Sequence, residues 1–243
     1  MIPLKTLEEK ADFVRVDNFG KIYLIRNNEV FLYSPDGKLL SRNSNNFLGN
    51  ITDLDATNGL EVLVFFEDQL QVLFLDNQLA LRGRDIPLDE LGFVQVSQVC
   101  TSHGNGIWLF DKTRFELIRL DKSNQHIARS GDLNQLLGFI PEPIYMREIN
   151  NWLYVVDPDR GVLVFDIFGA YYKTIPICCP AEIQVKDGNL IYYSTPYLIN
   201  FNLTTLDSDT VMHFEEENQQ ILLTKNRINI LNNSQLNILK QSP

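Results

Sequence analysis

The sequence predicts an all-β fold, a six-bladed β-propeller built from four-stranded antiparallel blades. Three observations predict it. A pair of short apolar runs occurs six times along the chain, and each second run ends at a turn-forming Ser, Asp or Asn. The copies follow one another at about 40 residues, which is the period of a propeller blade. A chain of 243 residues holds six such units and leaves little room for a seventh.

The paired runs read as β-hairpins. The first runs begin at Ile22, Val62, Ile107, Leu153, Ile191 and Ile221, and their starts are 40, 45, 46, 38 and 30 residues apart. The polar residues that end the second runs are Ser34, Asp76, Asp121, Asp166, Asn202 and Asn232, each 11 to 14 residues after the start of its first run. That distance fits two strands of about five residues joined by a tight turn. A β-sandwich also has short strands, but it gives no reason to repeat a hairpin with the same polar ending.

The hairpins and the apolar stretches between them set the blade boundaries. The whole chain, 1–243, is expected to form one domain, with blades at about 13–46, 51–88, 94–135, 143–177, 181–211 and 212–240. Residues 1–12 precede the first blade. We expect the stretch from Ile2 to Leu7 to add an outer strand to the last blade, beside the edge offered by Leu236 to Leu239, and so to close the ring.

Composition excludes several classes of function. The 21 Lys and Arg residues are outnumbered by 31 Asp and Glu residues, giving a net charge of −10. This deficit argues against binding to nucleic acid or to an anionic membrane surface, and no direct insertion into a membrane is expected. No apolar run reaches the roughly 18–20 residues of a membrane helix. Three cysteines, Cys100, Cys178 and Cys179, form neither a disulfide framework nor a metal motif, so they are predicted to be buried thiols.

Part of the chain resembles the NHL-type propellers. The residues that carry the resemblance are the stretch from Val16 to Leu24, the turn Ser34-Pro35-Asp36-Gly37, the run from Leu153 to Asp157, Arg160, and the run from Val164 to Asp166. The likeness covers blades one and four clearly, blades two and three in part, and the last two blades poorly. It implies a propeller fold, and it does not imply one function, because such propellers include both enzymes and protein-binding scaffolds.

The chain also resembles the small secreted propellers of Bacteroidota, a group that includes the plug subunit at the periplasmic end of the type IX secretion translocon. The overall size, the degenerate blades and Asp209-Thr210-Val211, which is similar to the O-glycosylation sequence of those bacteria, carry this resemblance. It implies an exported, periplasmic protein whose signal peptide has been removed and whose partner is a large outer-membrane translocon. The N-terminal residues lack a signal peptide of their own, and a cytoplasmic location is the alternative.

The sequence shows no catalytic residues, cofactor motif or metal site. His103, His126 and His213 fall on different blades without metal spacing and are expected to be surface or hydrogen-bonded histidines. Neither a nucleophile elbow nor a glycine-rich phosphate loop occurs. The acidic cluster from Asp157 to Gly161 lacks calcium-ligand spacing and is predicted to be a hairpin turn. Trp108 and Trp152 are predicted to fill space between blades.

Three connections between blades carry apolar residues in otherwise polar sequence. The motifs Phe47-Leu48-Gly49, Glu90-Leu91-Gly92 and Leu136-Leu137-Gly138 follow one another after 43 and 46 residues, so propeller symmetry places them on one face. Residues 85–90 and 132–135 are predicted to form single helical turns capped by their leading Asp. The candidate protein-binding residues are Phe47, Leu48, Leu88, Leu91, Leu133, Leu136 and Leu137. Either these side chains tuck against the blade edges or they form an exposed contact surface.

Two functions remain open from the sequence. The first is a non-catalytic propeller that binds another protein, as a structural or gating subunit of a bacterial envelope or secretion complex. The alternative is an enzyme or carbohydrate-binding protein with its site at the mouth of the central channel. The first predicts an exposed apolar surface. The second predicts polar side chains that converge where the inner strands meet.

Overall fold

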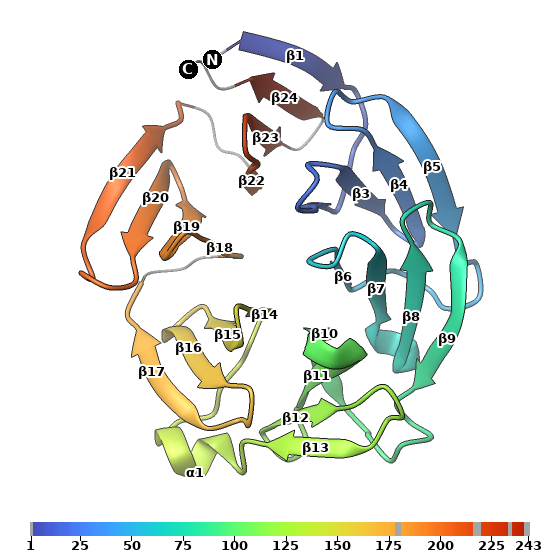
Figure 1. The fold of residues 1–243 in the computed structure, drawn as a ribbon, viewed down its shortest axis with the longest axis vertical. Coiled ribbons are helices and arrows are strands. Elements are labelled where there is room, and N and C mark those ends of the chain that lie inside the picture. Colours follow the sequence, from blue (N-terminus) through green and yellow to red (C-terminus); the bar gives the residue numbers. More distant parts are fainter. Residues whose placement is uncertain (1, 178–180, 216–219, 233–234, 241–243) are drawn as a thin grey trace. The chain divides into compact units, whose positions relative to one another are not determined.

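The computed structural model describes residues 2–177, 181–215, 220–232 and 235–240. These residues form 24 β-strands in six four-stranded antiparallel sheets, one five-residue α-helix and two short 3-10 turns. The fold is a six-bladed β-propeller, as predicted (Figure 1). In the first five sheets the strands follow one another in chain order from the inner strand of the blade to the outer one (Figure 1). In the sixth sheet the outer strand comes from the N-terminus.

By its contacts the chain divides into two units. The first unit holds residues 1–68, 74–84 and 183–243, and the second holds residues 69–73 and 85–182. The first, fifth and sixth sheets belong wholly to the first unit. The third and fourth belong to the second unit, and the strands of the second sheet are shared between the two.

The sheets of the first unit are short hairpins with one further strand on each side. The first sheet contains β2 (Phe13–Val16), β3 (Ile22–Arg26), β4 (Glu29–Tyr33) and β5 (Leu39–Ser44). The fifth contains β18 (Gln184–Lys186), β19 (Asn189–Ser194), β20 (Tyr197–Asn202) and β21 (Ser208–His213). The sixth contains β22 (Gln220–Leu223), β23 (Arg227–Leu231), β24 (Leu236–Lys240) and β1 (Ile2–Leu7).

The remaining sheets follow the same plan. The second contains β6 (Asp53–Asp55), β7 (Glu61–Phe66), β8 (Gln71–Asp76) and β9 (Leu81–Pro87), with the turn η1 (Glu67–Gln69) before β8. The third contains β10 (Val96–Ser102), β11 (Gly106–Asp111), β12 (Glu116–Leu120) and β13 (His126–Arg129), with η2 (His103–Asn105) after β10. The fourth contains β14 (Tyr145–Ile149), β15 (Trp152–Asp157), β16 (Gly161–Asp166) and β17 (Tyr171–Ile175), and helix α1 (Leu133–Leu137) precedes it.

The sixth sheet joins the two ends of the chain. Strand β1 lies antiparallel to β24, with Ile2 opposite Lys240 and Leu7 opposite Leu236. This is the pairing that the sequence suggested for its first residues. The outer strand of the last blade therefore comes from the N-terminus, and its pairing removes the free edge that β24 would otherwise expose.

The polar residue at the end of each hairpin closes the next turn. The Asp76 carboxylate accepts hydrogen bonds from the backbone N–H groups of Gln78 and Ala80, at 2.8 and 2.9 Å. Asp121 and Asp166 make the same pair of bonds in their own turns, to the residues two and four positions on. The repeated ending is thus explained locally, because these side chains satisfy backbone donors in a tight turn.

The hydrophobic core lies between neighbouring sheets. In the first unit, one cluster joins the sixth and first sheets around Val14 and Leu222, and another joins the fifth and sixth around Leu198 and Ile228. In the second unit, one cluster joins the third and fourth sheets and includes Cys100, which is fully buried, as predicted for this thiol. Cys178 and Cys179 lie outside the described residues. No helix in the part of the chain that the structure describes is long and apolar enough to cross a membrane.

Candidate functional site

Two of the seven predicted contact residues belong to the core. Leu88 and Leu133 are fully buried, and Leu133 packs in the cluster between the third and fourth sheets. Neither side chain is available to a partner, so their assignment to an exposed contact surface is wrong. The reason is that both backbones are tied to the turns of the neighbouring hairpins. Leu88 follows β9 directly and its N–H donates to the carbonyl oxygen of Leu70, while Leu133 begins α1 and its N–H donates to the carbonyl oxygen of Phe115.

The other five predicted residues divide between two environments. Leu48, Leu91 and Leu137 are half-buried, and Leu137 packs against the same core cluster as Leu133. Phe47 is 92% exposed and Leu136 is 51% exposed. Both arrangements expected for these loops therefore occur. Leu48, Leu91 and Leu137 are turned partly inward, whereas Phe47 and Leu136 face solvent.

Only one of the two predicted helical turns forms. Asp132 caps helix α1, and its carboxylate accepts hydrogen bonds from the backbone N–H groups of Asn134 and Gln135. Gly138 ends the helix in the left-handed conformation that favours glycine. The predicted turn over 85–90 is wrong, because β9 continues to Pro87 and the backbone N–H of Leu88 then bonds the carbonyl oxygen of Leu70.

Sequence reasoning missed two exposed apolar residues in the connection after α1. Ile140 is 53% exposed and Ile144 is 46% exposed, whereas Pro141 and Pro143 between them are buried. A residue before proline is biased toward extended backbone, and in an extended segment side chains alternate between two sides. Ile140, Glu142 and Ile144 therefore face solvent together. The alternating prolines are the signal that identifies this arrangement in the sequence.

The fourth sheet holds this segment in place. The backbone N–H of Glu142 donates to the Asp157 carboxylate at 2.9 Å, and the N–H of Ile144 donates to the carbonyl oxygen of Val156 at 2.9 Å. Phe139 lies beneath the Arg160 guanidinium, 4.6 Å from ring centroid to Cζ. We call the exposed side chains of Leu136, Ile140 and Ile144 the α1 apolar surface.

The acidic cluster beside this segment is a turn, as predicted. One oxygen of Asp157 accepts hydrogen bonds from the backbone N–H groups of Asp159 and Arg160, and the other binds Glu142. The carboxylate is therefore fully engaged by the backbone. Among the described residues no group of three or more His, Cys, Asp or Glu side chains is placed to hold a metal ion.

A second polar cluster joins the third and fourth sheets through Glu148. Its carboxylate accepts hydrogen bonds from the Ser102 hydroxyl, the Trp108 indole N–H at 2.7 Å and the His103 backbone N–H at 3.1 Å. The imidazole Nδ1 of His103 also lies 3.0 Å from this carboxylate. Arg119 donates to the Ser102 hydroxyl and to the carbonyl oxygen of Ile167.

The surroundings of Glu148 favour the ionised form of its carboxylate. Burial raises the pKa of Glu148, but hydrogen bonds from Ser102, His103 and Trp108 act together in the opposite direction and lower it below its ordinary value. A buried carboxylate with several donors is stabilised in its charged form. His103 is a hydrogen-bonded histidine, as predicted, and its ring lies beside the Glu148 carboxylate and the Arg119 guanidinium.

The two tryptophans differ in their surroundings. Trp108 is fully buried, and its bond to Glu148 of the next sheet confirms its predicted place between blades. Trp152 is half-buried and its ring lies against Tyr172 of its own sheet, with centroids 4.8 Å apart. The prediction that Trp152 fills space between blades is therefore wrong, because it is half-buried and its ring contact is with Tyr172 of β17 in its own blade.

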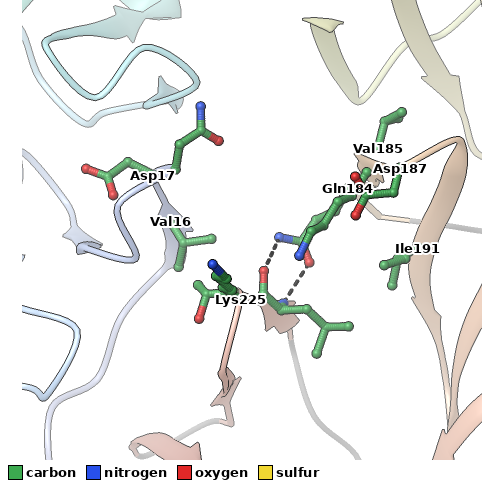
Figure 2. Close-up of a pocket in the computed structure, with 11 residues that line it drawn as sticks. Val16, Asp17, Gln184, Val185, Asp187, Ile191 and Lys225 are labelled. Carbon is green, nitrogen blue, oxygen red and sulfur yellow. Dashed lines mark hydrogen bonds between the residues drawn. The ribbon is translucent and has the colours of Figure 1, made fainter. Parts of the chain in front are cut away.

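A cavity of about 440 Å³ lies within the first unit, among strands β2, β18 and β22 of the first, fifth and sixth sheets. Its lining comes from the end of β2, from β18 and the start of β19, and from the end of β22. Figure 2 shows Val16 and Asp17 on one side, and Gln184, Asp187 and Ile191 on the other. Sequence reasoning assigned none of these residues to a site, because they come together only when blades far apart in the chain pack side by side.

Comparison with known proteins shows the fold and no family. No family model matches the chain, and no curated protein matches its sequence. Among solved structures it is similar to a chain in the Mitotic Checkpoint Complex, with a TM-score of 0.70 and 9% identity over 100% of this chain and 92% of that one. It is similar to virginiamycin B lyase from Staphylococcus aureus, with a TM-score of 0.68 and 10% identity over 98% of this chain and 99% of that one.

A third similar structure is the Pan2 WD40 domain of Neurospora crassa, with a TM-score of 0.61 and 11% identity over 99% of this chain and 85% of that one. At these identities the similarity shows the β-propeller fold alone. The fold is typical of protein-interaction scaffolds, and lyases share it. Function has to be argued from the surfaces and the cavity of this chain.

Proposed function

We propose that this protein is a non-catalytic propeller that binds another protein through the α1 apolar surface. The observation that carries the proposal is the exposure of Leu136, Ile140 and Ile144 on one short connection of the second unit. Exposed apolar residues scattered singly are common, whereas apolar side chains gathered in one patch are characteristic of a protein contact. Large apolar side chains of this kind supply much of the binding energy at interfaces.

The support beneath these residues favours binding. The capped helix α1, the buried prolines and the two backbone hydrogen bonds to Asp157 and Val156 fix the backbone before any partner arrives. A contact segment that is already ordered loses less conformational entropy on association. The surface is therefore preorganised, as the anchor residues of a stable interface need to be.

Charge indicates the kind of partner. Glu142 lies between Ile140 and Ile144 on the same outward side, and the chain as a whole carries a charge of −10. A partner with an apolar centre and basic residues around it would be attracted to this surface and oriented on it. An acidic partner would be repelled.

The finer proposal places the protein in a bacterial envelope or secretion complex, as a structural or plug-like gating subunit in the periplasm. Its partner would then be a large outer-membrane translocon. The size of the chain, its degenerate blades and Asp209-Thr210-Val211 support this. These three residues lie on β21, the outermost strand of its sheet, and all three are exposed. Peptide mapping of the native protein by mass spectrometry tests the location, because an O-glycan on Thr210 requires export, whereas an unmodified Thr210 contradicts this part of the proposal.

Substitution of the α1 apolar surface tests the binding proposal. The variant Leu136→Asp/Ile140→Asp/Ile144→Asp is compared with wild type and with Ile127→Asp, which alters an exposed residue on β13 of the same unit. Each protein is tagged and used to capture proteins from the source organism, which are then quantified by mass spectrometry. We expect a partner that wild type and Ile127→Asp retain and the triple variant loses.

The half-buried leucines are unsuitable for this test, because Leu137 supports the core as well as the surface. Circular dichroism and thermal melting show whether the triple variant keeps the native fold. If the folded triple variant retains the same proteins in the same amounts as wild type, the α1 apolar surface is not the contact site.

A further inference from the structure

The cavity in the first unit combines an apolar wall with charged groups at its edge. Its half-buried apolar residues are Val16, Val185, Ile191 and Leu223. Its polar residues are Asp17, Asn18, Gln184, Lys186, Asp187, Thr224 and Lys225. Pockets of a few hundred Å³ with mainly apolar walls and a few polar groups are the usual form of a small-molecule site.

Two of the polar groups in the lining are already occupied. The buried Asp17 carboxylate accepts hydrogen bonds from the backbone N–H groups of Phe19 and Lys21 and from the Tyr23 hydroxyl. The Gln184 side-chain amide donates to the carbonyl oxygen of Leu223 and accepts from its N–H, as the dashed lines in Figure 2 show. These bonds fix the position of both groups, which therefore shape the cavity.

Two lysine ammonium groups lie at the edge of the cavity. Both side chains, of Lys186 and Lys225, are exposed, and within the described parts of the chain neither ammonium group forms a hydrogen bond or an ion pair. With Asp17 engaged by its own turn, Asp187 is the remaining carboxylate of the lining. In formal charge these two ammonium groups balance the carboxylates of Asp17 and Asp187, so an anion is held here by direct contact with Lys186 and Lys225 and not by an excess of positive charge.

We infer that this cavity binds a small molecule that carries a carboxylate on an apolar body. The apolar part packs against Val185, Ile191 and Leu223, where its removal from water favours binding. The carboxylate lies at the edge, within reach of Lys186 and Lys225, and accepts charge-assisted hydrogen bonds from their ammonium groups. The site involves neither the residues nor the unit of the α1 apolar surface, so it stands or falls independently of the proposed function.

Calorimetric titration with naphthoate tests the inference, and naphthamide is its uncharged counterpart of nearly the same shape. We expect wild type to bind naphthoate at least about tenfold more tightly than naphthamide. The variant Lys186→Gln/Lys225→Gln is expected to lose this preference. Because the lysines are exposed, the preference for naphthoate is also expected to weaken as salt concentration rises.

The control is Lys122→Gln, which removes one positive charge from an exposed turn in the second unit. It should bind naphthoate as wild type does. A second variant, Val185→Asp, places a negative charge in the apolar wall and should weaken binding of both compounds. If wild type binds neither compound, or if the double lysine variant binds naphthoate as tightly as wild type, the inference is wrong.

Discussion

The side-chain amide of Gln184 forms two hydrogen bonds with the backbone of Leu223, at 3.0 and 2.7 Å, and so links the first strands of the fifth and sixth sheets. A related bond joins the sixth sheet to the first, where the backbone N–H of Val14 donates to the Gln220 amide oxygen at 2.7 Å. These side chains satisfy backbone groups of the neighbouring sheet that strand pairing leaves open. They therefore hold adjacent blades of the first unit together at their first strands.

Replacing Gln184 by alanine is expected to destabilise the protein. The substitution removes both bonds and leaves the N–H and carbonyl groups of half-buried Leu223 without these partners, at a cost of about 1–3 kcal/mol in the free energy of unfolding. Gln184→Glu keeps the acceptor for the Leu223 N–H but loses the donor, so its effect is expected to be at least as large near neutral pH, when the carboxylate faces a carbonyl oxygen. Urea denaturation followed by circular dichroism measures both.

The matched control is Gln125→Ala, because Gln125 is exposed and its side-chain amide makes only a long bond within its own turn. Its effect should lie within about 0.5 kcal/mol of zero. Equal stability of Gln184→Ala and Gln125→Ala would show that the link between the fifth and sixth sheets contributes nothing.

The sequence was sufficient to predict the blades because their signals are local. Alternating apolar residues and a terminal Asp such as Asp76 or Asp166 act within a few residues, and the structure shows those carboxylates bonded to the turns that follow them. The linking residues gave no such signal. Gln184 and Leu223 are 39 residues apart, and Val14 and Gln220 are 206 apart, so nothing in either local sequence identifies the partner.

The same distinction explains the errors at the candidate contact surface. Symmetry located the three apolar connections, but whether a leucine points inward depends on where the preceding strand ends. Strand β9 runs to Pro87 and carries Leu88 into the core, whereas a capped helix turns Leu136 outward. The cavity was beyond prediction for a related reason, because its walls come from three blades and no one of them carries a binding motif.

Stability at acid pH should depend on Glu148. Its pKa is lower in the folded protein than its ordinary value of 4.5, so the unfolded chain binds a proton more readily. The stabilisation is therefore fully present above about pH 4.5 and is lost as pH falls through the folded-state pKa. We expect Glu148→Gln to reduce the free energy of unfolding at neutral pH by about 1.5–3 kcal/mol, since hydrogen bonds to a buried charge are lost.

The variant should also show a weaker loss of stability between neutral and acid pH than wild type shows. Chemical denaturation at a series of pH values measures this slope, and Glu142→Gln, which changes an exposed carboxylate of the same unit, serves as the control. If Glu148→Gln and wild type lose stability in parallel on acidification, the ionised carboxylate of Glu148 does not hold the third and fourth sheets together.

Helix α1 provides a direct comparison between a supporting leucine and an exposed one. Leu133 is fully buried and Leu136 is 51% exposed, although they lie three residues apart on one short helix. Leu133→Ala removes atoms from the packed core and is expected to cost about 2–5 kcal/mol. Leu136→Ala changes an exposed side chain and should alter the free energy of unfolding by no more than about 0.5 kcal/mol.

If a partner binds the α1 apolar surface, the order of the two variants is reversed when affinity is measured on the folded proteins. Leu136→Ala weakens the complex directly, while Leu133→Ala acts only through the position of the helix. Denaturation and binding measured on the same two variants separate the roles, and a Leu136→Ala protein that is as destabilised as Leu133→Ala would show that Leu136 is a packing residue instead of part of a contact surface.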